Sequence, residues 1–180
     1  MKIIAFTGMP FSGKSEAVKI AKDMNIPVIR MGDMVWEETK NQGLKLNDEN
    51  VGIIANDFRK DYGMDIWAKK TLEKIKSLEN IEILVIDGIR NVEEIKTFET
   101  ALGKKFILIA VEVSDETRYK RAMTRNRKDD SKDIDLVKKR DKRELSWGLG
   151  NVIASSDIVI TNEAGIDEFR QKIKNILINF

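Results

Sequence analysis

The 180-residue chain contains no cysteine and no histidine. Without cysteine it can form no disulfide and no thiolate metal site. Without histidine it has no Ser-His-Asp triad, no imidazole metal ligand and no imidazole base that titrates near neutral pH. Any chemistry must therefore run on lysine, arginine, carboxylates, hydroxyl groups and backbone amides.

Long hydrophobic runs are also missing. No run in the chain approaches the ~18 apolar residues expected of a membrane-spanning helix. The opening apolar residues 3–6 are too few for the core of a secretory signal. We therefore expect a cytoplasmic protein with no membrane partner.

Charge, in contrast, is plentiful and almost balanced. Asp, Glu, Lys and Arg make up 34% of the chain, yet the formal net charge is only +2. Hydrophobic residues make up 42%, which is enough for a substantial core. This length fits one domain, so we predict a single domain over residues 1–180.

Short apolar runs alternate with segments of helical periodicity along the chain. Strands are predicted at residues 3–7, 27–30, 81–86, 105–113 and 158–160. Helices are predicted at residues 14–24, 32–43, 47–61, 64–79, 91–102, 114–127, 133–147 and 166–179. This alternation predicts an α/β fold of three layers, α/β/α, around a five-stranded parallel sheet. The helix-only stretch 32–79 interrupts it, which indicates a helical insert that binds a substrate.

Residues 8–15 read GMPFSGKS and fit the phosphate-binding pattern G-x-x-x-x-G-K-[ST] without a mismatch. An apolar strand precedes the motif and a helical pattern follows it, so a chance match in a turn is the weaker interpretation. The loop amides would bind phosphate oxygens, Lys14 would contact the β- and γ-phosphates, and the Ser15 hydroxyl would ligate Mg²⁺. The predicted ATP contacts are Gly8, Pro10, Phe11, Ser12, Gly13, Lys14, Ser15 and Glu16.

Asp87 directly follows the apolar run 83–86. A P-loop protein needs an acid at the end of a neighbouring strand, so we predict that Asp87 holds Mg²⁺ through water. The alternative is a turn aspartate before Gly88, a common pairing.

Further short motifs follow in an order that resembles the P-loop nucleoside monophosphate kinases, adenylate kinase especially. Residues 87–90 read DGIR and are similar to that family's Asp-Gly-x-x-Arg segment, and residues 32–34 look like the Gly-Asp-Met that opens its acceptor-binding helices. Residues 156–162 are similar to a segment of dephospho-coenzyme A kinase. Taken whole, the chain resembles an archaeal adenylate kinase-related family close to dephospho-coenzyme A kinase.

Arginine spacing extends the resemblance. Arg121 and Arg125 stand four residues apart, as do the two arginines that lead into the family's lid, and residues 127–130 resemble those that leave it. Arg140 lies at the position where that family has a further phosphate-binding arginine. The resemblance implies a short basic lid arm at about residues 118–143. It also implies an ATP contact at Arg121 and these catalytic residues: Lys14, Arg121, Arg125, Arg127 and Arg140.

The acceptor site implied by the resemblance departs from the family pattern in places. Its residues would be Gly32, Asp33, Trp36, Arg59, Gly88, Arg90 and Glu94. Trp36 replaces a family arginine and either stacks on a base or packs in the core, while Arg59 or Lys60 can replace the lost cation. Asp33 either orients the acceptor or caps the next helix. Glu94 either accepts from a base amino group or completes a capping box with Asn91.

The resemblance implies an enzyme: a nucleotide kinase-like phosphotransferase that uses ATP and Mg²⁺. Its acceptor would be a nucleoside monophosphate, with AMP favoured, or a related nucleotide such as dephospho-coenzyme A. Residues 162–165 fall where the family backs the donor base with backbone groups. Both a monomer and a homodimer remain open.

Residues 118–143 hold 12 Lys or Arg against five Asp or Glu. Helical spacing places Arg118, Arg121 and Arg125 on one face, which could close over a triphosphate because guanidinium groups bind phosphate oxygens in pairs. The same cations could instead bind RNA phosphates. An ATPase that assists RNA or ribosome assembly is therefore the alternative function.

Overall fold

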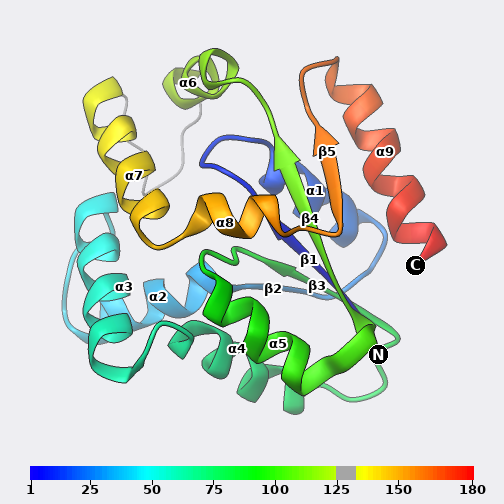
Figure 1. The fold of residues 1–180 in the computed structure, drawn as a ribbon, viewed down its shortest axis with the longest axis horizontal. Helices are drawn as coiled ribbons and strands as arrows, with labels where there is room; N and C mark the ends of the chain where they lie inside the picture. Colours follow the sequence, from blue (N-terminus) through cyan, green and yellow to red (C-terminus); the bar gives the residue numbers. More distant parts are fainter. Residues whose placement is uncertain (125–132) are drawn as a thin grey trace.

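The computed structural model describes residues 1–124 and 133–180 (Figure 1). Five parallel strands form one sheet in the order β2-β3-β1-β4-β5. They are β1 (Lys2–Thr7), β2 (Val28–Arg30), β3 (Ile83–Asp87), β4 (Phe106–Glu112) and β5 (Ile158–Thr161). The predicted α/β fold with a five-stranded parallel sheet is confirmed.

Helices connect the strands and cover both faces of the sheet (Figure 1). They are α1 (Lys14–Asp23), α2 (Met31–Asn41), α3 (Asp48–Tyr62), α4 (Ile66–Lys76), α5 (Val92–Leu102), α6 (Asp115–Thr124), α7 (Ile134–Ser146), α8 (Leu149–Ala154) and α9 (Ile166–Asn179), with a 3₁₀ turn at Gly103–Lys105. Most predicted bounds agree within a few residues. The predicted helix over 114–127 runs partly outside the described residues.

Helix α8 is not among the predicted elements. Gly148 adopts φ 100°, a left-handed conformation that favours glycine, and its carbonyl accepts the amide of Asn151 to start a new helix. The chain therefore turns after α7 and packs Leu149 and Val152 of α8 against the core.

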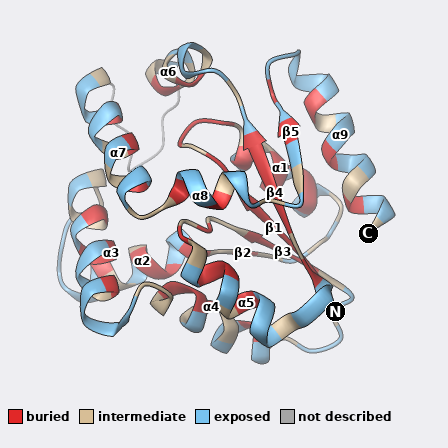
Figure 2. Cartoon of the chain, in the orientation of Figure 1, coloured by how far each residue is buried: buried red, intermediate tan, exposed pale blue. Residues whose placement is uncertain are grey.

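Strand residues alternate between two hydrophobic layers. Ile3 and Ala5 of β1 face the layer that α2, α3, α4, α5 and α8 cover, whereas Ile4 and Phe6 face α1 and α9. Figure 2 shows buried strands at the centre and exposed outer faces on the helices. Burial on both faces explains why the strands read as continuous apolar runs. Each fully buried large side chain contributes roughly 1.5–3 kcal/mol.

The carboxyl ends of the parallel strands all lie at one edge of the sheet. Gly8 follows β1, Met31 follows β2 and Gly88 follows β3, so the motifs of the sequence converge there. Ligands of open α/β sheets bind at this edge. Among the described residues, no helix is long and apolar enough to cross a membrane.

Candidate functional site

The loop between β1 and α1 has a backbone that only glycine allows at two points. Gly8 has φ 140° and Gly13 has φ 115°. A Cβ at Gly8 would overlap the carbonyl oxygen of Val111, and one at Gly13 would overlap the side-chain amide of Asn162. The two motif glycines are therefore required by conformation and by space together.

Lys14 lies buried at the start of α1 and turns back onto the loop. Its Nζ donates hydrogen bonds to the carbonyl oxygens of Gly8 at 2.6 Å and Met9 at 2.9 Å. Burial, with repulsion from Arg90, lowers the pKa of Lys14 to about 7. A bound polyanion would raise this pKa again, because an opposite charge favours the ammonium form.

Asn162 and Arg121 clamp the same loop from outside. Asn162 Nδ2 donates to the carbonyl oxygen of Ser12 at 2.8 Å. Arg121 Nη1 donates to that oxygen at 3.1 Å, and its Nη2 donates to the carbonyl oxygen of Asn162 at 3.0 Å. The sequence indicated only a backbone role near the donor base for residue 162, and its side chain was missed.

Asp87 ends β3 beside the loop. Its Oδ1 is buried and has no hydrogen-bond partner among the described residues, while Oδ2 lies 3.9 Å from Arg30 Nε. Such an orphaned carboxylate oxygen is expected where a cation binds. The described residues contain no cluster of three or more acidic side chains that could hold a metal alone. Any ion here would need phosphate or water oxygens as well.

A cavity of about 590 Å³ extends from the loop to the helices of the 31–76 region. It is lined by these predicted site residues: Pro10, Phe11, Ser12, Gly13, Lys14, Ser15, Glu16, Gly32, Trp36, Arg59, Asp87, Gly88, Arg90, Glu94, Arg121 and Arg140. The lining excludes Gly8 and Asp33. The predicted catalytic residues Arg125 and Arg127 lie outside the described residues.

In the same cavity, Glu144 joins two predicted arginines. Arg90 Nε lies 2.7 Å from Glu144 Oε2, as an ion pair without hydrogen-bond alignment, and Arg140 Nε donates to Oε1 at 2.9 Å. Burial alone would raise the pKa of Glu144, but Arg90 and Arg140 lower it to about 2. Glu144 therefore stays ionised and holds both guanidinium groups.

Glu94 lies beneath the cavity with no exposed surface. Its Oε1 accepts from Arg59 Nη2 at 3.1 Å, and its Oε2 accepts from the Arg90 amide at 2.7 Å. Burial raises the pKa of Glu94 despite Arg59. Asn91 caps α5 through the Glu94 amide, as predicted, but Glu94 turns to Arg90 and not to Asn91. Both carboxylate oxygens are thus already engaged.

Arg118 differs from its predicted role, and Asp33 differs from one of its two predicted roles, the helix cap. Arg118 is 2% exposed and is held by Asp115, Asp141 and the carbonyl of Pro10, so the prediction that it faces a triphosphate is wrong. Asp33 does not cap α2, because Arg30 occupies the N-cap position. It pairs instead with Arg30 at 3.3 Å and stays half exposed.

Several lining residues were not predicted. Among them are Asp48, Gly52, Trp67, Arg143, Glu144 and Trp147. For Arg143 and Glu144 a signal existed, since they lie three and four residues after Arg140 on one helix. Asp48 carries no motif, and only the fold brings it to the cavity.

Fold and loop together define a P-loop kinase-like protein. A family model described as an AAA domain matches residues 7–138. A UPF0200 protein of Methanosarcina acetivorans is 44% identical over 180 residues, which span 100% of this chain and 96% of that protein. One of Thermoplasma volcanium is 39% identical over 175 residues, covering 97% of this chain and 96% of its own length. The chain belongs to the UPF0200 family.

Two solved structures share the fold. TT1252 from Thermus thermophilus superposes with a TM-score of 0.61 at 18% identity, covering 99% of this chain and 97% of that one. Shikimate kinase from Acinetobacter baumannii in complex with shikimate gives a TM-score of 0.60 at 13% identity, covering 99% and 94%. At these identities the likeness concerns the fold alone.

Proposed function

We propose that the chain is a Mg-ATP-dependent phosphotransferase whose acceptor is a nucleoside monophosphate, with AMP favoured, or a related nucleotide such as dephospho-coenzyme A. One observation carries the proposal: a single cavity joins the phosphate-binding loop to a wall of arginine side chains. A simple hydrolase needs no second polar compartment beside its phosphate loop. A phosphotransferase needs both substrates in one enclosed space.

The donor half would bind ATP along residues 8–15. Lys14 would leave the carbonyl oxygens of Gly8 and Met9 and move to the β- and γ-phosphates. Ser15 and Asp87 would hold Mg²⁺, and the unpartnered Asp87 Oδ1 supports that fit. When bound, the ion would neutralise charge on the phosphate oxygens. Arg121 donates to the carbonyl oxygen of Ser12 in the loop, which supports its proposed contact with the triphosphate.

The acceptor half would be formed by α2, α3 and the segment after β3. Trp36, Arg59 and Arg90 line it from these three elements. An acceptor oxygen would form a bond to the γ-phosphorus as the bond to the β-γ bridging oxygen breaks, so ADP leaves. Arginine groups near the transferring phosphoryl speed such reactions by ~10³-fold or more. Arg140 is the described candidate, while Arg125 and Arg127 remain predictions.

Closure would accompany binding. The helices at residues 32–79 and the basic arm at 118–143 would approach each other over the substrates and exclude water. Because the arm is short, we expect measurable ATP hydrolysis without acceptor.

A coupled assay with purified protein tests the proposal. ADP formation from Mg-ATP is measured against a panel of nucleoside monophosphates, nucleosides and dephospho-coenzyme A, and the phosphorylated products are identified by mass spectrometry. The proposal expects at least one acceptor to be phosphorylated. If no acceptor of the panel gains a phosphate, the protein is not this phosphotransferase.

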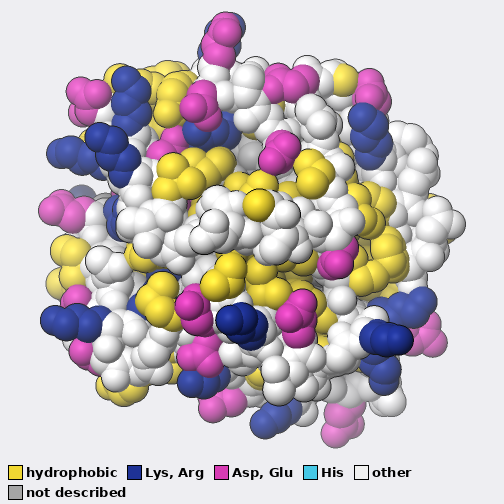
Figure 3. Space-filling model, in the orientation of Figure 1, with side chains coloured by type: hydrophobic (Ala, Val, Ile, Leu, Met, Phe, Trp, Pro, Cys, Tyr) yellow, Lys and Arg dark blue, Asp and Glu magenta, His cyan; other side chains and the backbone are white. Residues whose placement is uncertain are grey.

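A second candidate function rests on the outer surface of α7. Lys138, Lys139 and Lys142 are exposed there, and Figure 3 shows lysine and arginine side chains gathered over this helix. An RNA-dependent ATPase would use such a surface to bind phosphates. It predicts that RNA stimulates ATP hydrolysis and binds less tightly as salt rises. If RNA changes neither property, this alternative is excluded.

A further inference from the structure

An ion pair in the wall of the cavity joins α3 to α7. Arg143 Nη2 lies 2.8 Å from Oδ1 of Asp48, the first residue of α3. Arg140 Nη1 lies 3.5 Å from the same oxygen. All three side chains line the cavity. One carboxylate oxygen of Asp48 thus contacts the guanidinium groups of two arginines of α7.

The guanidinium of Arg143 packs against Gly52 of α3 and lies near Trp147. A Cβ on Gly52 would lie 2.7 Å from Arg143 Cζ, so a larger residue there would displace the guanidinium from its present position against α3. Arg143 Cζ also lies 5.8 Å from the centre of the Trp147 ring. Among the described residues, the buried Nε has no hydrogen-bond partner. These contacts position the guanidinium of Arg143, while Asp48 accepts from only some of the N–H donors of Arg143.

Asp48 is a weak occupant of this site. The side chains of Asp48 and Arg143 are each 23% exposed, and ion pairs within reach of water contribute little to stability. A phosphate group offers three oxygens and up to two negative charges. Paired guanidinium groups therefore bind a phosphate more strongly than they bind a single carboxylate. An arriving phosphomonoester can therefore displace Asp48.

We propose that Arg143 and Arg140 form the subsite for the anionic group of the acceptor, and that Asp48 fills this subsite until a phosphomonoester displaces it. The proposal rests on the proposed function, because it assumes that this half of the cavity takes an anionic acceptor. Asp48 then determines specificity. A ligand without a phosphate cannot compete with the carboxylate, so it gains nothing from the two arginines.

Calorimetry on the full chain tests this subsite, with the P-loop filled by the non-hydrolysable analogue AMP-PNP and Mg²⁺. AMP and adenosine are the two probes, since they differ only in the phosphate. Asp48→Asn is expected to bind AMP about tenfold more tightly than the wild type, because the phosphate no longer competes with a fixed carboxylate. Adenosine binding is expected to stay within about twofold.

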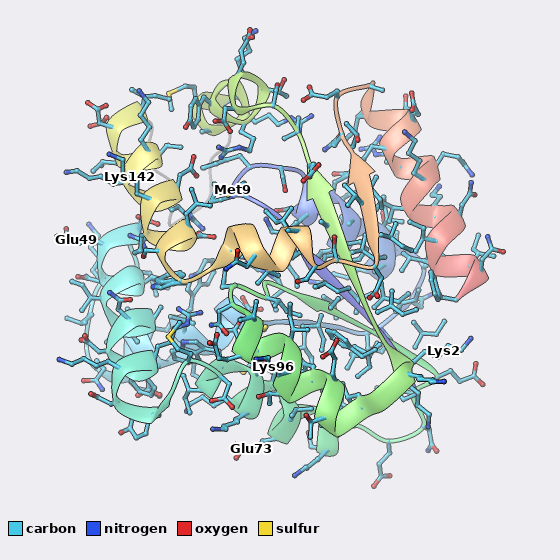
Figure 4. The ribbon with its side chains drawn as sticks, in the orientation of Figure 1. Lys2, Met9, Glu49, Glu73, Lys96 and Lys142 are labelled. Atoms are coloured by element: carbon cyan, nitrogen blue, oxygen red, sulfur yellow. The ribbon has the colours of Figure 1, made fainter. Side chains whose placement is uncertain are left out.

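Glu49→Gln is the matched control for Asp48→Asn. Glu49 lies one residue further along the first turn of α3, is exposed, and is labelled in Figure 4. Its substitution removes the same charge from the same helix terminus.

A second pair of variants probes the cations. Arg143→Met should weaken AMP binding about tenfold, whereas Lys142→Met, on the exposed side of α7 and also labelled, should not.

The outcomes separate this inference from the proposed function. Weaker AMP binding by Asp48→Asn would show that Asp48 closes the cavity and does not fill the subsite, which overturns the inference. An Asp48→Asn affinity equal to that of Glu49→Gln, or no AMP binding by any variant, also overturns it. Phosphoryl transfer to AMP by the wild type, together with such a result, leaves the proposed function standing. Tighter AMP binding by Asp48→Asn, without phosphoryl transfer to any acceptor, supports the subsite and excludes the proposed phosphotransferase function.

Discussion

Asn162 donates a hydrogen bond of 2.8 Å from its side-chain amide to the carbonyl oxygen of Ser12, 150 residues earlier in the chain. This bond ties the end of β5 to the phosphate-binding loop, and Arg121 binds the same oxygen. The loop is therefore held in shape before any ligand arrives. Preorganised donors are what a phosphate site requires, because the protein then need not reorganise as charge develops.

We expect Asn162→Ala to loosen the loop. Loss of the bond to Ser12 should lower the free energy of unfolding by about 1–2 kcal/mol, and Mg-ATP should bind about tenfold more weakly. Urea unfolding and calorimetry measure the two effects. Asn175→Ala, at an exposed position on α9, is the control. Unchanged ATP affinity in Asn162→Ala would mean that the loop keeps its shape without this clamp.

Arg118 is expected to act in stability more than in chemistry. Arg118→Met removes a buried cation from Asp141 and should lower the free energy of unfolding by about 3 kcal/mol, because a buried carboxylate is left unpaired. Lys120→Met, two residues along and exposed in its pair with Glu116, should change stability by less than about 0.5 kcal/mol. Equal effects of the two substitutions would contradict the structural role of Arg118.

The pKa of about 7 at Lys14 predicts proton uptake when ATP binds. Above pH 7 much of the ligand-free protein carries a neutral Lys14, and the bound triphosphate favours the ammonium form. At pH 8 we expect binding to take up close to one proton, measured by calorimetry in buffers of different ionisation enthalpy. Lys14→Ala should abolish this uptake. Uptake that persists in Lys14→Ala would assign the proton to another group.

The same lysine affects stability in the same direction with pH as a salt-bridged acid, but at higher pH. Its pKa in the folded protein lies below its ordinary value of 10.5, so the unfolded chain binds more protons between pH 7 and that value. The contribution of Lys14 to the free energy of unfolding should therefore rise with pH across this window. Chemical unfolding of the wild type and Lys14→Met at pH 6.5 and 9.5 measures it. A stability difference that does not change with pH would contradict the lowered pKa.

Glu144 provides a test at acid pH. Its pKa of about 2 lies below its ordinary value of 4.5, so its contribution to stability is present above pH 4.5 and is lost as pH falls toward 2. Glu144→Gln should lower the free energy of unfolding by about 2–3 kcal/mol at pH 6, because Arg90 and Arg140 lose their partner. The difference should shrink at pH 3. A difference that is equally large at both pH values would contradict the ion-pair origin.

The sequence predicted those parts of the site that depend on local chain geometry. Gly8 and Gly13 carry the loop, and the fold follows from apolar runs alternating with helical periodicity. Lysine and serine have a fixed spacing in the loop motif, and Asp87 follows a neighbouring strand, so Lys14 and Asp87 could be placed near each other. A parallel sheet then brings their strand ends to one edge.

Contacts between distant elements could not be predicted in this way. Arg143 and Asp48 are 95 residues apart and meet only because α7 lies beside α3. Arg118 shows the opposite error. Periodicity places it on the face of Arg121, but it cannot reveal that Asp141 of α7 takes up that charge. A single sequence indicates which face a side chain occupies, and the partner on that face depends on tertiary packing.

The central claim is that Lys14 and the arginine wall act on two substrates in one cavity. Phosphorus NMR of purified protein with Mg-ATP and AMP measures it directly, because ATP, ADP, AMP and free phosphate give separate signals. Phosphoryl transfer consumes AMP, whereas hydrolysis releases free phosphate and leaves AMP intact. The account predicts that AMP is consumed in step with ATP, and that Lys14→Ala slows this at least about 10³-fold. Release of free phosphate at an unchanged rate, with AMP intact, would contradict it.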